Sequence, residues 1–201
     1  RQASLKYSPV HGSGGSPTLG GDLLVFSCDR ATDPFVVALD AATGAVRWRT
    51  PRNTPATKNF SFSTPLEIEV HGARQIISAG SGLVGAYDPE SGQEIWRVLY
   101  GEGYSIVPRP VYAAGLLFVC SGYEGPVLLA INPDGARGNV TESHVAWRFR
   151  KGGAHTSSLL AVGDELYFVS DNGIAKCLDA RTGKVHWDER LGDEFSASPI
   201  Y

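Results

Sequence analysis

The four tryptophans of this 201-residue chain all lie in one local sequence pattern. The pattern is a small residue, an Asp two positions later, a Thr or Ser followed by Gly, and a Trp four positions after that Gly. Residues 38–48, 86–96 and 177–187 follow it, whereas in residues 130–147 an Asn replaces the Asp and an insertion delays the Trp. Such recurrence indicates one supersecondary unit repeated along the chain. The repeat positions are Asp40, Gly44, Trp48, Asp88, Gly92, Trp96, Asn132, Trp147, Asp179, Gly183 and Trp187.

Each copy of the pattern predicts a β-hairpin. An Asp that ends an apolar strand can accept backbone N–H bonds of the turn, and the Gly supplies a positive φ. A further apolar strand precedes each hairpin, and a short segment that begins with a small residue or Pro precedes that strand. Each repeat therefore contains four strands. The strands preceding the hairpins are expected at 22–28, 74–80, 115–121 and 164–170.

Four strands in a unit of roughly 40–50 residues are typical of a β-propeller blade. We therefore expect an all-β fold of about four four-stranded blades. The N-terminal segment 1–15 is expected to be the outer strand of a preceding blade plus a loop, with Leu5 at the Trp position, and 197–201 to begin a following blade. The predicted blades are 16–52, 64–101, 109–152 and 157–193.

The hairpin pattern resembles the repeat of the PQQ-binding-like β-propeller family. The resemblance implies seven or eight blades, so that this chain is part of a larger ring and contacts the remaining blades. It also implies a bacterial, extracytoplasmic protein, periplasmic or secreted, and a Trp of one blade that packs on the Gly turn of the next. We thus expect Trp48, Trp96 and Trp187 to be structural, each contributing about 3–5 kcal/mol to stability.

Composition excludes several classes of function. A net charge of −3 and a pI near 6.0 provide no basic surface for nucleic acid. No apolar run approaches the roughly 18 residues of a membrane-spanning helix, so no membrane insertion is expected. The cysteines Cys28, Cys120 and Cys177 lie far apart, which favours buried free thiols over a zinc site or a disulfide framework.

Catalytic residues are not expected in this segment. Quinone-dependent dehydrogenases of the family that the pattern resembles use adjacent cysteines, a calcium site and a catalytic Asp, and none of these is recognisable here. We therefore expect no metal and no cofactor, and lean away from an enzyme. One alternative remains a segment of a PQQ-dependent oxidoreductase whose PQQ and calcium ligands lie on other blades. Another is the sensor domain of a kinase-linked receptor.

The polar residues that do not repeat precede the first strand of each blade, in loops expected around the channel mouth. Candidate ligand residues there are Lys58, Ser61, Tyr104, Arg109, His155 and Ser196. Arg109 replaces a Ser or Thr and could hold a carboxylate or phosphate, although pairing with Glu102 would also explain it. An aromatic residue or His followed by Ser or Thr recurs in these loops, which is equally consistent with a device that starts the strand.

The leading functional hypothesis is a non-catalytic exported propeller that serves as a binding or scaffold module. Its partner would be a protein or a small anionic ligand at the channel mouth. The insertion at 135–144 is polar and contains Gly, so we expect an exposed loop there.

Overall fold

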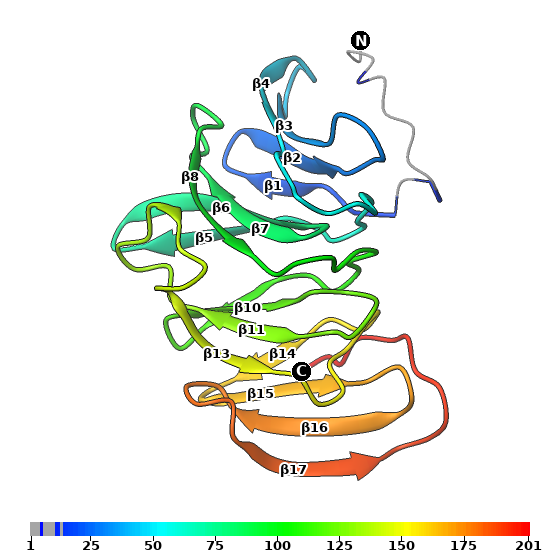
Figure 1. The fold of residues 1–201 in the computed structure, drawn as a ribbon. Coiled ribbons are helices and arrows are strands. Elements are labelled where there is room, and N and C mark those ends of the chain that lie inside the picture. Colours follow the sequence, from blue (N-terminus) through cyan, green and yellow to red (C-terminus); the bar gives the residue numbers. More distant parts are fainter. Residues whose placement is uncertain (1–4, 6–10, 13) are drawn as a thin grey trace.

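The computed structural model describes residues 5, 11–12 and 14–201. These residues form strands and no helix, so none of the described part is a helix long and apolar enough to cross a membrane. The strands make four sheets that follow one another in chain order (Figure 1). Three are antiparallel and four-stranded, and the other adds one short parallel strand to four antiparallel ones. The all-β prediction and the propeller-type architecture are confirmed. The N-terminal strand expected within 1–15 lies largely outside the described residues.

The first two sheets are built from consecutive strands. The first contains β1 (Thr18–Gly20), β2 (Leu23–Cys28), β3 (Phe35–Asp40) and β4 (Val46–Pro51). The second contains β5 (Leu66–Val70), β6 (Ala73–Gly80), β7 (Leu83–Tyr87) and β8 (Glu94–Leu99).

The last two sheets repeat this order, with one short strand inserted in the chain. The third contains β9 (Val111–Ala113), β10 (Leu116–Cys120), β11 (Leu128–Ile131) and β13 (Val145–Phe149). The fourth contains β14 (Leu160–Val162), β15 (Glu165–Val169), β16 (Ile174–Asp179) and β17 (Val185–Arg190). The inserted strand is β12 (Gly138–Asn139).

The turn between the third and fourth strands has the same structure in three sheets. The Asp40 carboxylate accepts bonds from the backbone N and the hydroxyl of Thr43, at 2.8 and 2.7 Å, and Gly44 has a φ of 72°. Asp88 makes the same pair of bonds with Ser91, and Asp179 makes them with Thr182. The side chain therefore replaces water on turn N–H groups, as the pattern predicted.

A β-bulge follows from this turn and explains the small residue in the pattern. The register shifts after Ala38, so that Ala38 lies opposite Trp48 across the strand pair. The same shift puts Ala86 opposite Trp96 and Cys177 opposite Trp187. An indole directly opposite leaves room only for a small side chain.

Two tryptophans join neighbouring sheets through the turn of the next sheet. Trp48 Nε1 donates to the Pro89 carbonyl at 2.7 Å, and a Cβ on Gly92 would lie only 2.5 Å from the indole. Trp147 Nε1 donates to a carbonyl of the fourth sheet, that of Ala180, at 3.1 Å. Glycine is needed at these turns both for its positive φ and because the ring lies against its Cα.

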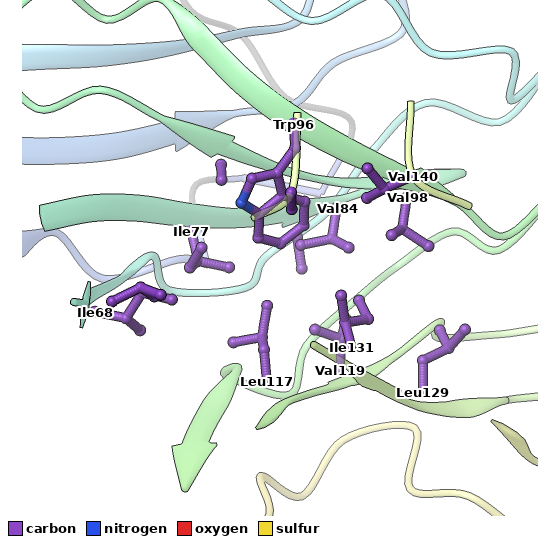
Figure 2. Packing of buried hydrophobic residues seen from close by; sticks show 14 of the residues in the cluster. Ile68, Ile77, Val84, Trp96, Val98, Leu117, Val119, Leu129, Ile131 and Val140 are labelled. Atoms are coloured by element: carbon purple, nitrogen blue, oxygen red, sulfur yellow. The ribbon is translucent and has the colours of Figure 1, made fainter. Parts of the chain in front are cut away.

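The joint between the second and third sheets is built differently. Trp96 is fully buried among apolar side chains of both sheets, and its Nε1 donates to Gln75 Oε1 of its own sheet at 2.8 Å (Figure 2). The insertion at 135–144 is mostly exposed, as expected, but it is not simply a loop. Its strand β12 pairs in parallel with β8, while Ala136 and Val140 are buried. The insertion displaces the turn that would otherwise receive Trp96, and its apolar side chains fill the joint instead.

Among the described residues, no sheet follows the one that carries Trp187. Its side chain lies on β17 and is 43 % exposed, whereas Trp48 is 7 % exposed. The structure therefore changes the expectation that both tryptophans stabilise the chain equally.

We predict that Trp48→Ala lowers the free energy of unfolding by about 3–5 kcal/mol, because a buried aromatic side chain and its hydrogen bond are lost. Trp187→Ala should lower it by about 1 kcal/mol or less, since an exposed side chain loses little on truncation. Urea titration of the two variants measures the difference. Equal losses would contradict the assignment of Trp48 to a joint that Trp187 lacks.

A second prediction concerns acid. Bonds from the Ser91 hydroxyl and backbone hold the pKa of Asp88 below its ordinary 3.8. A carboxyl whose pKa is lowered by folding stabilises the fold above about pH 4, and this contribution is lost as the pH falls through the folded pKa. Asp88→Asn should therefore flatten the dependence of unfolding free energy on pH as the pH falls below about 4. Glu90→Gln, an exposed residue of the same turn, is the control; equal slopes in both variants would contradict the role of Asp88.

Candidate binding surface on the loop face

In each sheet, the loop before the first strand and the loop between the second and third strands lie at the same end. The Asp–Gly turns lie at the opposite end. We call the end that carries these loops the loop face, formed by residues 58–64, 103–109, 120–127 and 153–158. Its loops are bonded to one another through the backbone. Ser105 N donates to the Phe60 carbonyl at 2.8 Å, and Tyr123 N donates to the Tyr104 carbonyl at 2.9 Å. These backbone groups are paired, so the loop face offers mainly side chains to a ligand.

A continuous series of rings crosses the loop face. Ring centroids are 5.3 Å apart between His11 and Phe60, 5.3 Å between Phe60 and Tyr104, 6.2 Å between Tyr104 and Tyr123, and 4.8 Å between Tyr123 and His155. We call these five residues the aromatic arc. They come from the loops of all four sheets, and Tyr123 is 41 % exposed. Three of the recurring positions, Phe60, Tyr104 and His155, are thus joined in one surface by His11 and Tyr123.

Lys58 lies over the centre of the aromatic arc. Its ammonium is 2.5 Å from Glu124 Oε1 and 4.4 Å from the centroid of the Tyr104 ring. The Tyr104 hydroxyl donates to the same Glu124 oxygen at 3.1 Å. The bond to Glu124 raises the pKa of Lys58, and the ammonium in turn lowers the pKa of Glu124. The charge of Lys58 is therefore compensated within the chain.

Arg109 differs from the equivalent residues of other sheets. Hydroxyls at this position accept backbone N–H bonds across the joints: Thr64 Oγ1 accepts from Ser16 N at 3.2 Å, and Ser198 Oγ accepts from Ser158 N at 2.9 Å. Arg109 cannot accept such a bond, and its own N–H donates to Ser158 Oγ at 3.0 Å. Its exposed side chain has no hydrogen-bond or ion-pair partner within the described residues. Glu102 instead accepts bonds from the backbone and hydroxyl of Thr57.

His155 closes the arc on the side of the fourth sheet. Its backbone N donates to Asp171 Oδ2 at 2.7 Å, and its Nδ1 lies 3.8 Å from the same oxygen. Thr156 donates its hydroxyl to Asp171 Oδ1 at 2.6 Å. Asp171 therefore fixes the loop that carries His155. Ser196, also a candidate, is exposed and lines an open pocket with Asp171, Glu194 and Phe195.

Ser61 lies beneath the loop face in a buried polar network. Its hydroxyl contacts the Ala79 and Ile106 carbonyls at 3.1 and 3.3 Å, which places it away from any ligand. Below it, Arg52 Nε lies 2.9 Å from Asp29 Oδ1, and both side chains are fully buried. Arg52 also donates to the Ser78 carbonyl of the second sheet at 3.1 Å. A buried pair with these additional bonds holds the first two sheets in one arrangement under the arc.

No cluster of three or more His, Cys, Asp or Glu side chains arranged for a metal occurs among the described residues. The three cysteines are free and buried at separate places, as predicted, and burial raises the pKa of Cys28 and of Cys120 to about 12.

The sequence patterns missed several residues of this surface. His11, Tyr123 and Glu124 carry no repeat signal, because the equivalent loops of the other sheets have different lengths and sequences. Phe62 was part of a loop singled out from the sequence, but only the structure shows its ring 6.2 Å from Phe60.

The sheets, their Trp–turn joints and the loop face define a partial β-propeller of the PQQ-binding-like class. The family model described as "Outer membrane protein assembly factor BamB" matches residues 6–189, and this chain belongs to that family. BamB of Burkholderia pseudomallei (strain K96243) is 40 % identical over 47 residues, which are 23 % of this chain and 12 % of that protein.

Solved structures agree on the fold. BamB from Moraxella catarrhalis is similar with a TM-score of 0.65 at 17 % identity, over 88 % of this chain and 51 % of that one. Quinohemoprotein alcohol dehydrogenase from Comamonas testosteroni is similar with a TM-score of 0.66 at 16 % identity, over 94 % of this chain and 43 % of that one. This chain thus spans about half the length of the Moraxella protein and less of the dehydrogenase.

We predict that Gly122→Ala disrupts the aromatic arc. Gly122 has a φ of 79°, and a Cβ there would lie 2.3 Å from the Tyr104 carbonyl oxygen, so the loops at 103–105 and 121–123 would have to separate. We expect a loss of about 3 kcal/mol in unfolding free energy and a weaker near-ultraviolet circular dichroism signal from the stacked tyrosines.

Gly125→Ala is the matched control. Gly125 has a φ of 91° with nothing within 4 Å of an added Cβ, so only the backbone penalty of about 1 kcal/mol applies. If both variants lose the same stability and keep the tyrosine signal, close contact between the two loops does not hold the arc.

Proposed function

We propose that this chain is part of a non-catalytic, extracytoplasmic scaffold propeller that binds a segment of another protein through the loop face. Membership of the BamB family supports a role in a protein assembly, because the relatives are named as outer membrane protein assembly factors. Family membership by itself leaves the binding surface open.

The aromatic arc is the observation that carries the proposal. Protein interfaces are enriched in Tyr, Phe and other aromatic side chains, which bury a large area with few rotatable bonds. In the arc, the rings are ordered by contact with one another and by the paired backbone beneath them. A partner would therefore meet a surface that loses little conformational freedom on binding.

The charges favour a protein segment over a small anion as the main ligand. Lys58, which the sequence suggested for an anion, is paired with Glu124. Arg109 remains available, and we propose that it binds a carboxylate of the same partner. One exposed guanidinium contributes modestly to binding affinity, whereas the aromatic arc supplies most of the contact area.

Site-specific photocrosslinking in the producing cell tests the proposal. With p-benzoylphenylalanine in place of Phe62, we expect a discrete protein adduct, and we expect Tyr123→Ala to reduce it by about tenfold, as loss of a central aromatic contact does. The same probe in place of Val46, an exposed residue of β4, is the control. An adduct that forms equally from position 46, or that survives Tyr123→Ala unchanged, would contradict binding at the arc.

The oxidoreductase alternative is tested separately. The protein is incubated with PQQ and calcium and examined for bound quinone and for dye reduction. We expect neither, and tight stoichiometric quinone binding would overturn the scaffold proposal.

A further inference from the structure

We propose that the aromatic arc receives an arginine side chain of the partner at Tyr104, Tyr123 and Glu124, where the chain's own Lys58 now occupies the position of that cation. The inference rests on the proposed function and adds to it the chemistry of the segment that is bound. Lys58 is then an internal competitor rather than a ligand residue.

The contacts of Lys58 are those of a cation in a receptor site. Its ammonium lies 4.4 Å from the Tyr104 ring centroid and 2.5 Å from a carboxylate oxygen of Glu124. A ring face and a carboxylate that converge on one point are a combination that selects a positive charge. Because the Tyr104 hydroxyl also donates to Glu124, the carboxylate is oriented toward this point by a group other than Lys58.

The net charge around the site is negative and favours a further cation. A second carboxylate, Glu102, lies close enough for the charge of Glu124 to raise its pKa, and Lys58 lowers the pKa of both carboxyls. With Lys58 in place, these three groups sum to one negative charge. A partner cation therefore meets a favourable potential even before Lys58 leaves.

Lys58 can leave because it is held at the surface. The side chains of Lys58 and Glu124 are 49 % and 54 % exposed. Exposed ion pairs contribute little to stability, and an ammonium on a flexible stem regains rotamer freedom and water when released. Displacement therefore needs no rearrangement of the loop backbones.

Arginine fits the site better than lysine. The rings of Tyr104 and Tyr123 are stacked, with 6.2 Å between centroids and 27° between planes. A planar guanidinium can lie along such a pair while two N–H groups on one of its edges donate to one carboxylate, a geometry that an ammonium cannot match. Tyr123 is exposed and available for this contact, whereas Lys58 contacts Tyr104 alone.

The backbone at the site supports a binding role. Glu124 and Ser105, which follow the two tyrosines in the chain, have φ values of 65° and 52°. Residues other than glycine rarely adopt this left-handed conformation, and where they do, it is often at ligand-binding positions.

The test uses N-acetyl-L-arginine amide as the probe and N-acetyl-L-citrulline amide as its neutral isostere, followed by NMR shifts of the Tyr104, Tyr123 and Glu124 amides. Lys58→Met should bind the arginine probe about tenfold more tightly than the unmodified protein, because the internal cation no longer competes. Glu124→Gln added to Lys58→Met should abolish that gain. The citrulline probe should bind weakly to every variant. Lys184→Met, on the opposite end of the fourth sheet, is the matched control and should change nothing.

Two results would overturn the inference. One is an affinity for the arginine probe that Lys58→Met leaves unchanged or lowers, and the other is equal binding of the citrulline probe. The photocrosslinking experiment separates this failure from failure of the scaffold role. If the adduct at position 62 depends on Tyr123 but is unaffected by Glu124→Gln, the scaffold proposal stands and the arginine inference is wrong. Absence of any adduct dependent on the arc removes the scaffold proposal itself.

Discussion

The contact between an indole and a glycine turn is the constraint on which the arrangement of these sheets depends. A bulge places each Trp opposite a small residue of the preceding strand, as with Ala38 and Trp48. The indole then extends beyond its own sheet, and its N–H reaches a carbonyl in the next turn, Pro89 in this case. Because that turn is itself held by an Asp side chain, the geometry of a hairpin is transmitted to the joint between sheets. This local rule sets the first and third joints between sheets, whereas the second joint is built around the buried Trp96.

The joints between sheets determine where the loops lie. Neighbouring sheets contact each other through their first strands at two joints, where β1 lies against β5 and β9 against β14. The loops at one end of successive sheets are therefore brought within bonding distance, and the pair Asp29–Arg52 together with Ser61 secures the polar layer beneath them. The rings of the aromatic arc lie in irregular loops, but the hydrogen bonds beneath them connect these loops to the sheets.

The regular part of this fold could be predicted from the sequence because its determinants are local and repeated. Asp, Gly and Trp at fixed spacing specify turn, bulge and joint without reference to distant residues. The joint of Trp96 could not be predicted, since an insertion unique to one repeat supplies a parallel strand and buried apolar side chains. The recurring aromatic positions could be found in the sequence because they repeat. Glu124 could not, because it lies in a loop without a repeat pattern and is 66 residues from its partner Lys58.

Repetition also separates structural residues from candidates for function. The residues that recur from sheet to sheet have structural roles in turns and in joints between sheets. A binding surface therefore has to come from residues that do not recur. Lys58, Glu124 and Tyr123 belong to this second set, and together they give the free protein an exposed ion pair beside stacked rings. A partner that offers only apolar contact must leave this ion pair in place, whereas one that brings a guanidinium can replace it and reach both rings. The internal pair therefore acts as a filter, since it penalises partners that lack the matching charge.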